Sequence, residues 1–224
     1  MIIILFLCLI PLPAVTLYGH GDPYSFEIES VKKDPTFYKK IDGFVLSLTA
    51  EQMTYLLDHL PVASVLLNEY GIHTLRIRDT RPDTFHAEDE SGLKGVFTLV
   101  SCIDQGSGNV REYSGNGWIE NKVISRISAD VIARIGYKEP DAGNTVNELE
   151  FWVSVDGLLL DILCRIFRPV LLSVLTKKFD DFILVVQRFT DRLQEDPVEA
   201  VDFLQRRNRG EYEIEEFKRV FSIP

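Results

Sequence analysis

The clearest hydrophobic pattern in the chain lies between residues 146 and 193. From Val146 to Val155 apolar and polar side chains alternate strictly, which is typical of a β-strand with one buried face. From Leu158 to about Leu193 we expect a long helix, and its first turns are apolar around most of the circumference. Such a helix must be covered on several sides or must line an apolar space. The pattern therefore predicts a half-buried strand followed by a long, enclosed helix.

After the N-terminal 42 residues, the sequence predicts a short strand and two short helices. Residues Gly43–Leu48 alternate and predict the strand. The sequence Thr49–Gln52 matches a capping box at the start of a helix that reaches His59. Pro61 suits the first turn of a second helix, and Gly71 its C-terminal end. The apolar faces of the two helices are formed by Met53, Leu56, Leu57 and Leu60 and by Leu66, Leu67 and Tyr70.

The middle of the chain changes to a hydrophobic period of two, which predicts strands. The alternating sets are Leu75 and Ile77; Phe85, Ala87 and Asp89; Leu93, Gly95, Phe97, Leu99, Ser101 and Ile103; and Ile127, Ala129, Val131, Ala133, Ile135 and Tyr137. Residues 104–109 have the composition of a loop, and residues 139–144 that of a turn. In the strand predicted over residues 111–120, Gly115 and Gly117 permit a bulge or a strong bend. Consecutive strands with short connections form an antiparallel meander.

Together these elements predict an α+β protein with helices before and after the sheet. We expect a curved antiparallel sheet wrapped around a long C-terminal helix, with two short helices after the first strand. The expected division of the chain is an export signal at 1–20, an N-terminal arm at 21–42, the sheet-and-helix domain at 43–193 and a charged helical tail at 194–224.

The order of the elements and two sequence segments are typical of a known family. Phe44–Gln52 is a strand that runs directly into a capped helix, and Glu148–Gly157 leads into Leu158–Pro169 and the long helix. On these patterns, residues from Phe44 to Leu193 resemble the START/Bet v 1-like superfamily of helix-grip ligand-binding and polyketide cyclase-like (SRPBCC) proteins. The resemblance implies a seven-stranded antiparallel sheet around the last helix, with a cavity for lipids, sterols or polyketides. Pro169 departs from an uninterrupted helix and predicts a kink or break.

Composition and charge limit the function. The 224 residues are 46% hydrophobic and 26% charged, as in ordinary globular proteins. The net charge of -10 argues against nucleic-acid binding, because phosphates are repelled by an acidic surface. The oligomeric state does not follow from the composition.

The N-terminal segment predicts export. Residues 1–20 contain no charged side chain, and their apolar core at Ile2–Ile10 is followed by Pro11 and Pro13. This run is shorter than the roughly 20 apolar residues of a membrane-spanning helix. We therefore expect a cleaved export signal and a periplasmic or secreted protein. An uncleaved membrane anchor is the alternative, since the basic residue that usually precedes such a core is absent.

Cysteines and histidines give no sign of a metal or cofactor site. Cys102 and Cys164 have apolar neighbours and are interpreted as buried small hydrophobic residues; one disulfide is the alternative in an exported protein. The histidines, none with metal-ligand spacing, are His20, His59, His73 and His86. The chain also has no phosphate-binding loop and no nucleophile elbow. The sequence thus predicts no metal, no cofactor and no catalytic residue.

Two groups of charged residues have a structural and a functional interpretation. Asp161, Arg165 and Arg168 have the spacing of an ion pair on a helix surface, which we favour over a lipid head-group site at a pocket mouth. Glu148 and Glu150 lie opposite the apolar stripe of their strand. We therefore expect them in solvent and not in a paired-carboxylate acid/base site.

The apolar stripes predict a ligand-binding cavity between sheet and helix. Small residues such as Ala129 and Ala133 interrupt the stripes, and small side chains beneath a helix leave volume unfilled. We expect the cavity to be lined by Phe97, Leu99, Tyr113, Ala129, Val131, Leu149 and Phe151 from the sheet and by Leu160, Cys164 and Phe167 from the helix.

The expected function is non-enzymatic binding or transport of a hydrophobic, lipid-like molecule. The resemblance also allows a cyclase- or hydratase-type enzyme, which needs polar groups converging inside the pocket. The inward stripes offer only Ser101, Tyr113, Tyr137 and Asn147. A third interpretation is an interaction domain whose interior is filled.

The tail predicts two more helices. The apolar face of the first, after Pro197, is formed by Val198, Val201, Phe203 and Leu204, and the second is expected over residues 211–221. Packing of this tail against the domain is the simpler interpretation. Transient contact with a membrane, or docking to a partner, is the alternative.

Overall fold

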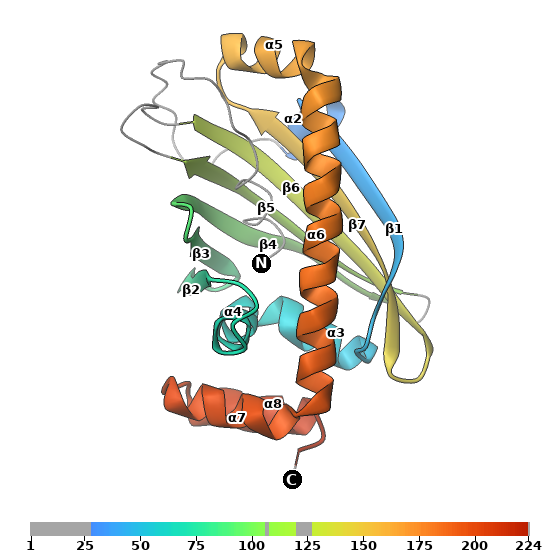
Figure 1. Cartoon of the computed structure of the whole chain (residues 1–224), viewed down its shortest axis with the longest axis vertical. Coiled ribbons are helices and arrows are strands. Elements are labelled where there is room, and N and C mark those ends of the chain that lie inside the picture. The colour runs from blue at the N-terminus through green and yellow to red at the C-terminus, as the bar shows by residue number, and fades with distance from the viewer. Residues whose placement is uncertain (1–27, 106–107, 120–126, 224) are drawn as a thin grey trace.

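A computed structural model describes residues 28–105, 108–119 and 127–223, without the side chains at 158–160, 163, 168–172 and 174–175 (Figure 1). The strands are β1 (Phe37–Leu46), β2 (Leu75–Arg81), β3 (Thr84–Asp89), β4 (Leu93–Gln105), β5 (Gly108–Ile119), β6 (Ile127–Asp141) and β7 (Asn144–Val155). They form one antiparallel sheet in the order β1-β7-β6-β5-β4-β3-β2. This confirms the α+β class and the antiparallel meander. The expected export signal lies outside the described residues.

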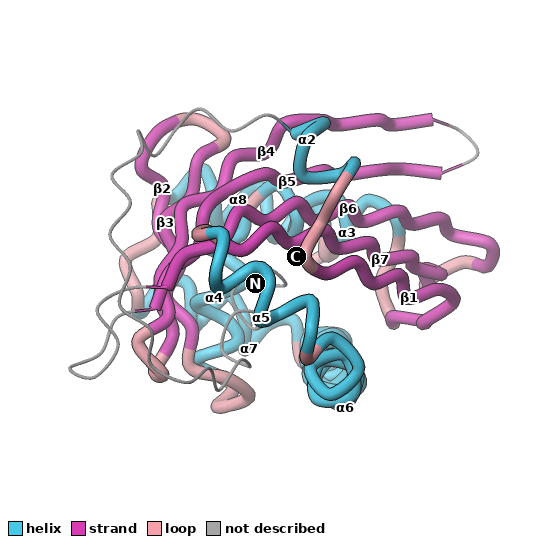
Figure 2. Tube along the Cα trace, turned by 90° about the horizontal axis from the view of Figure 1, so that it is seen from above, coloured by secondary structure: helices cyan, strands magenta, loops and turns pink. Residues whose placement is uncertain are grey.

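The helices cover both faces and one end of the sheet. They are α2 (Ile28–Lys33), α3 (Ala50–Asp58), α4 (Leu60–Glu69), α5 (Leu158–Ile166), α6 (Arg168–Glu195), α7 (Pro197–Arg206) and α8 (Glu211–Val220). Helices α3 and α4 connect β1 to β2, as predicted, and α6 is the long helix after the sheet. Figure 2 shows α2 on the opposite side of the sheet from α6. Figure 1 shows α7 and α8 at the end of α6 that is far from α5.

The strict alternation in β7 separates a buried face from a solvent face, as predicted. Leu149, Phe151 and Val153 are buried, and the Phe151 ring lies 5.5 Å from that of Phe179 in α6. On the other face, the Glu150 carboxylate accepts a hydrogen bond from the Tyr38 hydroxyl at 2.9 Å. Glu148 forms an ion pair there with Lys40. The long helix therefore packs on the apolar face, and the two glutamates are not an internal carboxylate pair.

The first strand is longer than the sequence indicated. It begins at Phe37 instead of Gly43 and pairs with β7 from Val153 onward, so residues 37–42 belong to the sheet and not to an arm. Residues 37–42 do not show a clear alternation of apolar and polar side chains, because several of them are polar and exposed. A register shift between Asp42 and Phe44 also interrupts the alternation. Sheet pairing at this edge is set by β7 and not by local hydrophobicity.

A β-bulge in β4 changes which side chains face the core. The pairing with β5 shifts after Leu99, which lies opposite Tyr113, so that Ser101 lies opposite Glu112. A bulge adds one residue and reverses the alternation that follows it. The prediction that Ser101 and Ile103 share the face of Leu99 is therefore wrong. The predicted loop at 104–109 is also shorter, since the ladder continues to Gln105 and Gly108.

The two strand glycines in β5 do not form a bulge. The pairing register is regular on both sides of Gly115 and Gly117. A side chain at Gly115 would overlap the Phe97 ring, which is buried across the β4–β5 pair. The glycine therefore makes room for an aromatic ring on the inner face of the sheet.

The helix that was expected from Leu158 to Leu193 is divided at Phe167 into α5 and α6. Pro169 lies in the first turn of α6, where its missing N–H costs nothing. The predicted break is confirmed, but the expectation that the first part is enclosed is wrong. Ile162 is 43% exposed and Ile166 65% exposed, because α5 turns away from the sheet face that α6 covers.

Several local signals in the first half are confirmed. The Thr49 side chain accepts a hydrogen bond from the Gln52 backbone N–H, and the Gln52 side chain accepts one from the Thr49 N–H, which completes the capping box. Pro61 lies in the first turn of α4. Gly71, after the end of α4, has a φ of +64°, a left-handed value that favours glycine.

The C-terminal tail forms the two predicted helices and packs against the domain. Phe203 of α7 lies with its ring 5.2 Å from that of Tyr70 at the end of α4. In α8 the Phe217 ring lies 5.9 Å from that of Tyr55 in α3. Both phenylalanines are buried. The tail is thus a second layer beneath α3 and α4, as the simpler interpretation expected.

The close approach at Gly115 gives a direct test of this packing. In Gly115→Ala the new methyl group would lie 2.5 Å from the Phe97 ring and even closer to the Val96 carbonyl oxygen. Overpacking of this kind typically costs about 1–3 kcal/mol. We expect the free energy of unfolding, measured by urea denaturation, to fall by at least about 2 kcal/mol.

Gly136→Ala is the matched control in the neighbouring strand. Its new methyl group would lie 3.7 Å from the Glu148 Cβ, an ordinary contact. The free energy of unfolding should change by less than about 0.5 kcal/mol. Equal effects of the two substitutions would contradict the assigned contact with Phe97.

Candidate functional site

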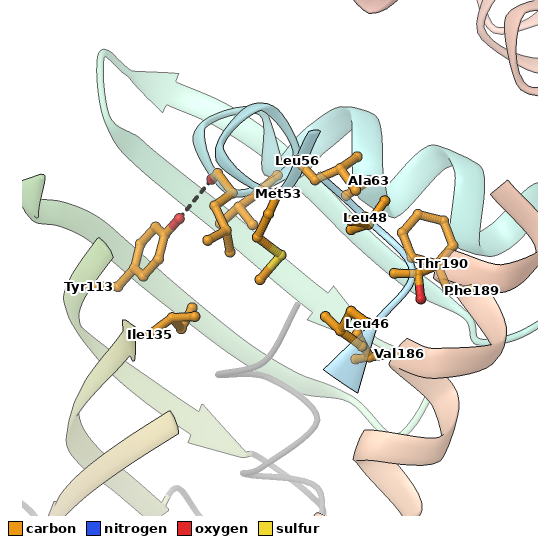
Figure 3. A pocket seen from close by; sticks show the side chains of 12 residues that line it. Leu46, Leu48, Met53, Leu56, Ala63, Tyr113, Ile135, Val186, Phe189 and Thr190 are labelled. Atoms are coloured by element: carbon orange, nitrogen blue, oxygen red, sulfur yellow. Dashed lines mark hydrogen bonds between the residues drawn. The ribbon is translucent and has the colours of Figure 1, made fainter. Parts of the chain in front are cut away.

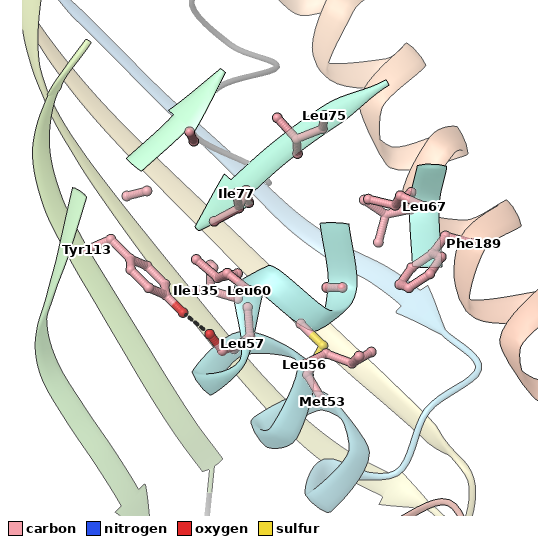
Figure 4. Close-up of a cluster of buried hydrophobic side chains, with 14 of the residues drawn as sticks. Met53, Leu56, Leu57, Leu60, Leu67, Leu75, Ile77, Tyr113, Ile135 and Phe189 are labelled. Atoms are coloured by element: carbon pink, nitrogen blue, oxygen red, sulfur yellow. Dashed lines mark hydrogen bonds between the residues drawn. The ribbon is translucent and has the colours of Figure 1, made fainter. Parts of the chain in front are cut away.

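An apolar pocket lies where α3, α4 and α6 meet the sheet (Figure 3). Side chains from β1, β5 and β6 form its sheet side. Its lining consists of Leu46, Leu48, Met53, Leu56, Leu57, Leu60, Ala63, Tyr113, Ile135, Val186, Phe189 and Thr190. Figure 4 shows that several of these side chains also belong to the main hydrophobic cluster. The pocket is therefore a gap in the core, part of which is open to solvent.

The pocket is small. It encloses about 550 Å³ when its part open to solvent is included, and only about 50 Å³ of this can be occupied by the centre of a water molecule. Pockets for drug-sized ligands typically have about 300–1,000 Å³, so the enclosed space is small by comparison. A short hydrocarbon segment has this size, whereas a complete sterol or phospholipid is far larger.

The polar groups in the lining are already hydrogen-bonded. The Tyr113 hydroxyl donates to the Leu57 carbonyl oxygen at 2.7 Å. The Thr190 hydroxyl donates to the Gln187 carbonyl oxygen at 3.0 Å within its own helix. Burial raises the pKa of Tyr113 well above its ordinary value, so its hydroxyl stays protonated. The lining thus offers hydrophobic contact and no acid or base.

Polar side chains of the sheet hold α3 over the pocket. The buried Arg111 guanidinium, on β5, donates to the Asp58 carboxylate at the end of α3 at 2.6 and 3.1 Å and to Asp104 at 2.7 Å. Burial disfavours its charge, but these hydrogen bonds raise the pKa of Arg111 above its ordinary value, so it stays charged. On β6, the Tyr137 hydroxyl lies 2.8 Å from the Thr54 hydroxyl of α3.

A neighbouring carbonyl group decides which hydroxyl is the donor in the hydrogen bond between Tyr137 and Thr54. The Thr54 hydroxyl lies 2.8 Å from the Ala50 carbonyl oxygen and donates its hydrogen there. It therefore accepts from Tyr137. The Tyr113 and Tyr137 hydroxyl hydrogens are both used to fix α3, which leaves neither available to a ligand.

The structure places most of the sequence-predicted lining residues in the core but outside the lining of this pocket. Of the ten, Tyr113 lines it. Those that are buried elsewhere on the inner faces are Phe97, Ala129, Val131, Leu149, Phe151 and Cys164, and Leu99 is partly buried. Phe167 is 56% exposed at the α5–α6 break and is not part of the core. The Leu160 side chain lies outside the described set. A ligand-binding role for these residues stays a prediction.

The main omission of the sequence-based reasoning was the contribution of the two short helices. Met53, Leu56, Leu57 and Leu60 stood out as an apolar face, but periodicity did not show which surface that face covers. Ala63 gave no signal at all. Contacts between residues far apart in sequence, such as Tyr113 with Leu57, decide that these helices form the pocket.

The cysteines follow the prediction only in part. Cys164 is buried, as expected, but Cys102 is exposed. The β4 bulge moves Cys102 opposite Arg111, near the end of the strand pair. Both thiols are free, so the alternative of one disulfide between them is wrong.

The predicted charged group on the helix surface forms an ion pair, although the side chain of its third member, Arg168, lies outside the described residues. Arg165 donates to Asp161 at 2.7 Å and also to Asp34 at 3.0 Å, so the predicted helix-surface pair is confirmed. Among the described residues no group of three or more histidines, cysteines and carboxylates could hold a metal ion. None of the helices within the described ranges is long and apolar enough to cross a membrane.

Comparisons with known proteins add little. No known family profile and no curated protein sequence matches the chain. A conserved protein from Geobacillus kaustophilus aligns with 66% of this chain and 93% of its own, at 14% identity and a TM-score of 0.38. A hypothetical protein from Helicobacter pylori aligns with 78% of this chain and 99% of its own, at 10% identity and a TM-score of 0.42. No conclusion about function follows from alignments of this quality.

The contact between Arg111 and Asp58 predicts unequal effects of two similar substitutions. The Arg111 side chain is 2% exposed, and those of Asp58 and Asp104 are 32% and 59% exposed. A hydrogen bond to a charged group contributes about 1.5–3 kcal/mol when it is shielded from water, and an exposed ion pair less than about 1 kcal/mol. Asp58→Asn should therefore lower the free energy of unfolding by about 2 kcal/mol, and Asp104→Asn by less than about 1 kcal/mol. Denaturant titration measures both, and the reverse order would show that Asp58 does not anchor α3.

Proposed function

We propose that this protein binds a hydrophobic small molecule without changing it chemically. The observation that carries the proposal is the pocket between α3, α4, α6 and the sheet, whose lining is apolar apart from two hydroxyls. Both hydroxyls are hydrogen-bonded within the protein. Burial of hydrocarbon in such a space is favourable, whereas a strongly polar ligand would lose its hydration without replacement.

The volume of the pocket limits the size of the ligand. The small enclosed space suits the inner end of an unbranched hydrocarbon chain, and the rest of the chain would lie in the part of the pocket that is open to solvent. We therefore propose that the pocket takes the chain of a lipid-like molecule or a short apolar compound. Carriage or sensing of such a molecule fits the function expected from the sequence.

The chemistry of the lining favours a carrier over an enzyme of the cyclase or hydratase type. Such an enzyme needs a general acid, a base or a nucleophile in contact with its substrate. The described lining contains no histidine, carboxylate, lysine or cysteine. Ser101, one of the polar groups expected inside, lies beyond the β4 bulge on the other face of the sheet.

We also propose that the domain is a helix-grip fold of the START/Bet v 1-like kind. The support is the strand order, the two short helices directly after the first strand, and the long helix over the same face of the sheet. The division at Pro169 and the added layer of α7 and α8 are features of this chain.

The proposal is tested by filling the pocket. Ala63 lines it from α4, and Ala63→Leu would place an isobutyl group in the empty space. We expect this substitution to weaken binding of 1-fluorohexane, followed by ¹⁹F NMR, by about tenfold or more, which is about 1.4 kcal/mol. Because a void is filled, the free energy of unfolding should change by less than about 1 kcal/mol.

Ala133→Leu is the matched control. Ala133 is fully buried between its cross-strand neighbours Tyr113 and Phe151 but does not line the pocket. Its enlargement should cost about 1–3 kcal/mol of stability while the folded protein still binds the probe. No binding of 1-fluorohexane by the unaltered protein would contradict the proposal and favour an interaction domain with a filled interior.

We further propose, on the sequence alone, that residues 1–20 direct export. N-terminal sequencing of the protein from the periplasm or the medium should find a first residue between about 15 and 22. Retention of Met1 in a soluble cytoplasmic pool would contradict export, and retention in the membrane fraction would favour the uncleaved anchor.

A further inference from the structure

Two buried side-chain oxygens, those of Tyr70 and Asn147, have no hydrogen-bond partner among the described residues, and Asn147 is the one on the sheet. Its side chain is on the inner face of β7, and the residue is 1% exposed. The carboxamide nitrogen lies 3.2 Å from the Phe44 carbonyl oxygen and 3.0 Å from that of Thr145. The carboxamide oxygen has no partner in the described part of the chain. A buried acceptor without a hydrogen-bond partner costs free energy, so we expect a donor that the described residues do not include.

The orientation of the carboxamide is fixed by chemistry. Two carbonyl oxygens face one end of the group, and a carbonyl oxygen can only accept. The nitrogen must therefore lie at that end, since an exchanged position would bring three acceptors together. The oxygen consequently points away from these carbonyls and keeps its capacity to accept.

The strand register places Asn147 beside the pocket floor. It lies opposite Tyr137 on β6 and Phe44 on β1. Two positions further along those strands, on the same face, are Ile135 and Leu46, and both line the pocket. Diagonal neighbours of this kind are about 7–8 Å apart in an antiparallel sheet. Asn147 is not itself one of the lining residues, but it lies between two of them on the sheet side of the pocket.

Neighbouring groups do not supply the missing donor. The Tyr137 hydroxyl donates to Thr54, and the Tyr113 hydroxyl donates to the Leu57 carbonyl oxygen. A stably held internal water needs about two to four polar partners. The polar groups closest to Asn147 lie at the nitrogen end of its carboxamide and not at its oxygen. The partner that fits is a donor carried by a molecule that enters the pocket.

We propose that Asn147 is the polar contact of the pocket and accepts a hydrogen bond from the hydroxyl of a neutral, alcohol-type ligand. This rests on the proposed function and names its ligand class. A carboxylate or phosphate would place an acceptor against an acceptor. An ammonium group would lose its hydration and gain one neutral partner, which is a poor exchange in an apolar space. A hydroxyl on a thin hydrocarbon chain matches both the acceptor and the volume.

The test compares two probes in two proteins. The probes are 1-hexanol, which can donate, and 1-fluorohexane, which cannot; 1-hexanol is followed by its displacement of 1-fluorohexane in ¹⁹F NMR. We expect Asn147→Leu to weaken binding of 1-hexanol by about fivefold relative to that of 1-fluorohexane, as for loss of one neutral hydrogen bond. An unchanged ratio of the two affinities would overturn the role of Asn147.

Thr145→Val is the matched control for the polar cluster. It removes the Thr145 hydroxyl, which accepts from the Asn147 nitrogen at 3.1 Å, and leaves the Asn147 oxygen in place. The preference for 1-hexanol should persist in this variant. Its loss here to the same extent as in Asn147→Leu would show a structural effect of the cluster and overturn the proposed contact.

A measurement on the unaltered protein keeps the proposal testable even if Asn147→Leu does not fold. The methyl ether 1-methoxyhexane keeps the oxygen of 1-hexanol but has no hydrogen to donate, and it is the more hydrophobic of the two. We expect 1-hexanol to bind more tightly nonetheless, and equal or tighter binding of the ether would overturn the proposal. If none of these three compounds binds, both the proposed function of the pocket and the role of Asn147 are contradicted. If 1-fluorohexane binds but 1-hexanol does not bind more tightly than the ether, only the role of Asn147 is contradicted.

Discussion

The attachment of α3 to the inner face of the sheet is the constraint on which the pocket depends. Three neighbouring side chains on the inner face donate hydrogen bonds to this helix. Arg111 donates to Asp58, Tyr113 to the Leu57 carbonyl oxygen, and Tyr137 to Thr54. Hydrogen bonds are directional, so they fix the distance between helix and sheet more tightly than apolar contact would. The helix is held at its C-terminal half, and its apolar side chains then cover the sheet without filling all of the space. The pocket is the volume that this fixed spacing leaves.

The other two helices around the pocket are positioned by the edges of the sheet. At the β2 edge, the Asn68 side chain of α4 pairs with the backbone of Leu75, and the Ser64 hydroxyl accepts from the Ile77 N–H at 3.3 Å. At the β1 edge, the Gln187 side chain of α6 donates to the Val45 carbonyl oxygen at 3.2 Å. These bonds satisfy backbone groups that an open edge would expose to pairing with other chains. Covering the edges and enclosing the pocket are therefore achieved by the same helices.

Much of the fold could be predicted because its signals are local. The alternation around Phe151, the capping box at Thr49 and the break at Pro169 each follow from a few adjacent residues. The site could not be predicted in the same way, because it depends on contacts between distant residues. Nothing near Asp58 in the sequence indicates that it pairs with Arg111, and the β4 bulge has no glycine to mark it. The expected pocket was consequently placed around Ala129 and Phe151, whereas the space lies at the end of the sheet that α3 covers.

Met53 offers the most direct test of the central claim, that a hydrophobic molecule enters this pocket. The chain has two methionines, and Met53 lines the pocket while the other is Met1. The ¹³C-labelled methyl signal of Met53 can therefore be followed in solution while 1-hexanol is added. The account predicts a saturable shift of this signal in the unaltered protein, and a shift in Ala63→Leu that needs about tenfold more 1-hexanol or more. A Met53 signal that stays unchanged at high probe concentration, or that saturates at the same concentration in both proteins, would contradict it.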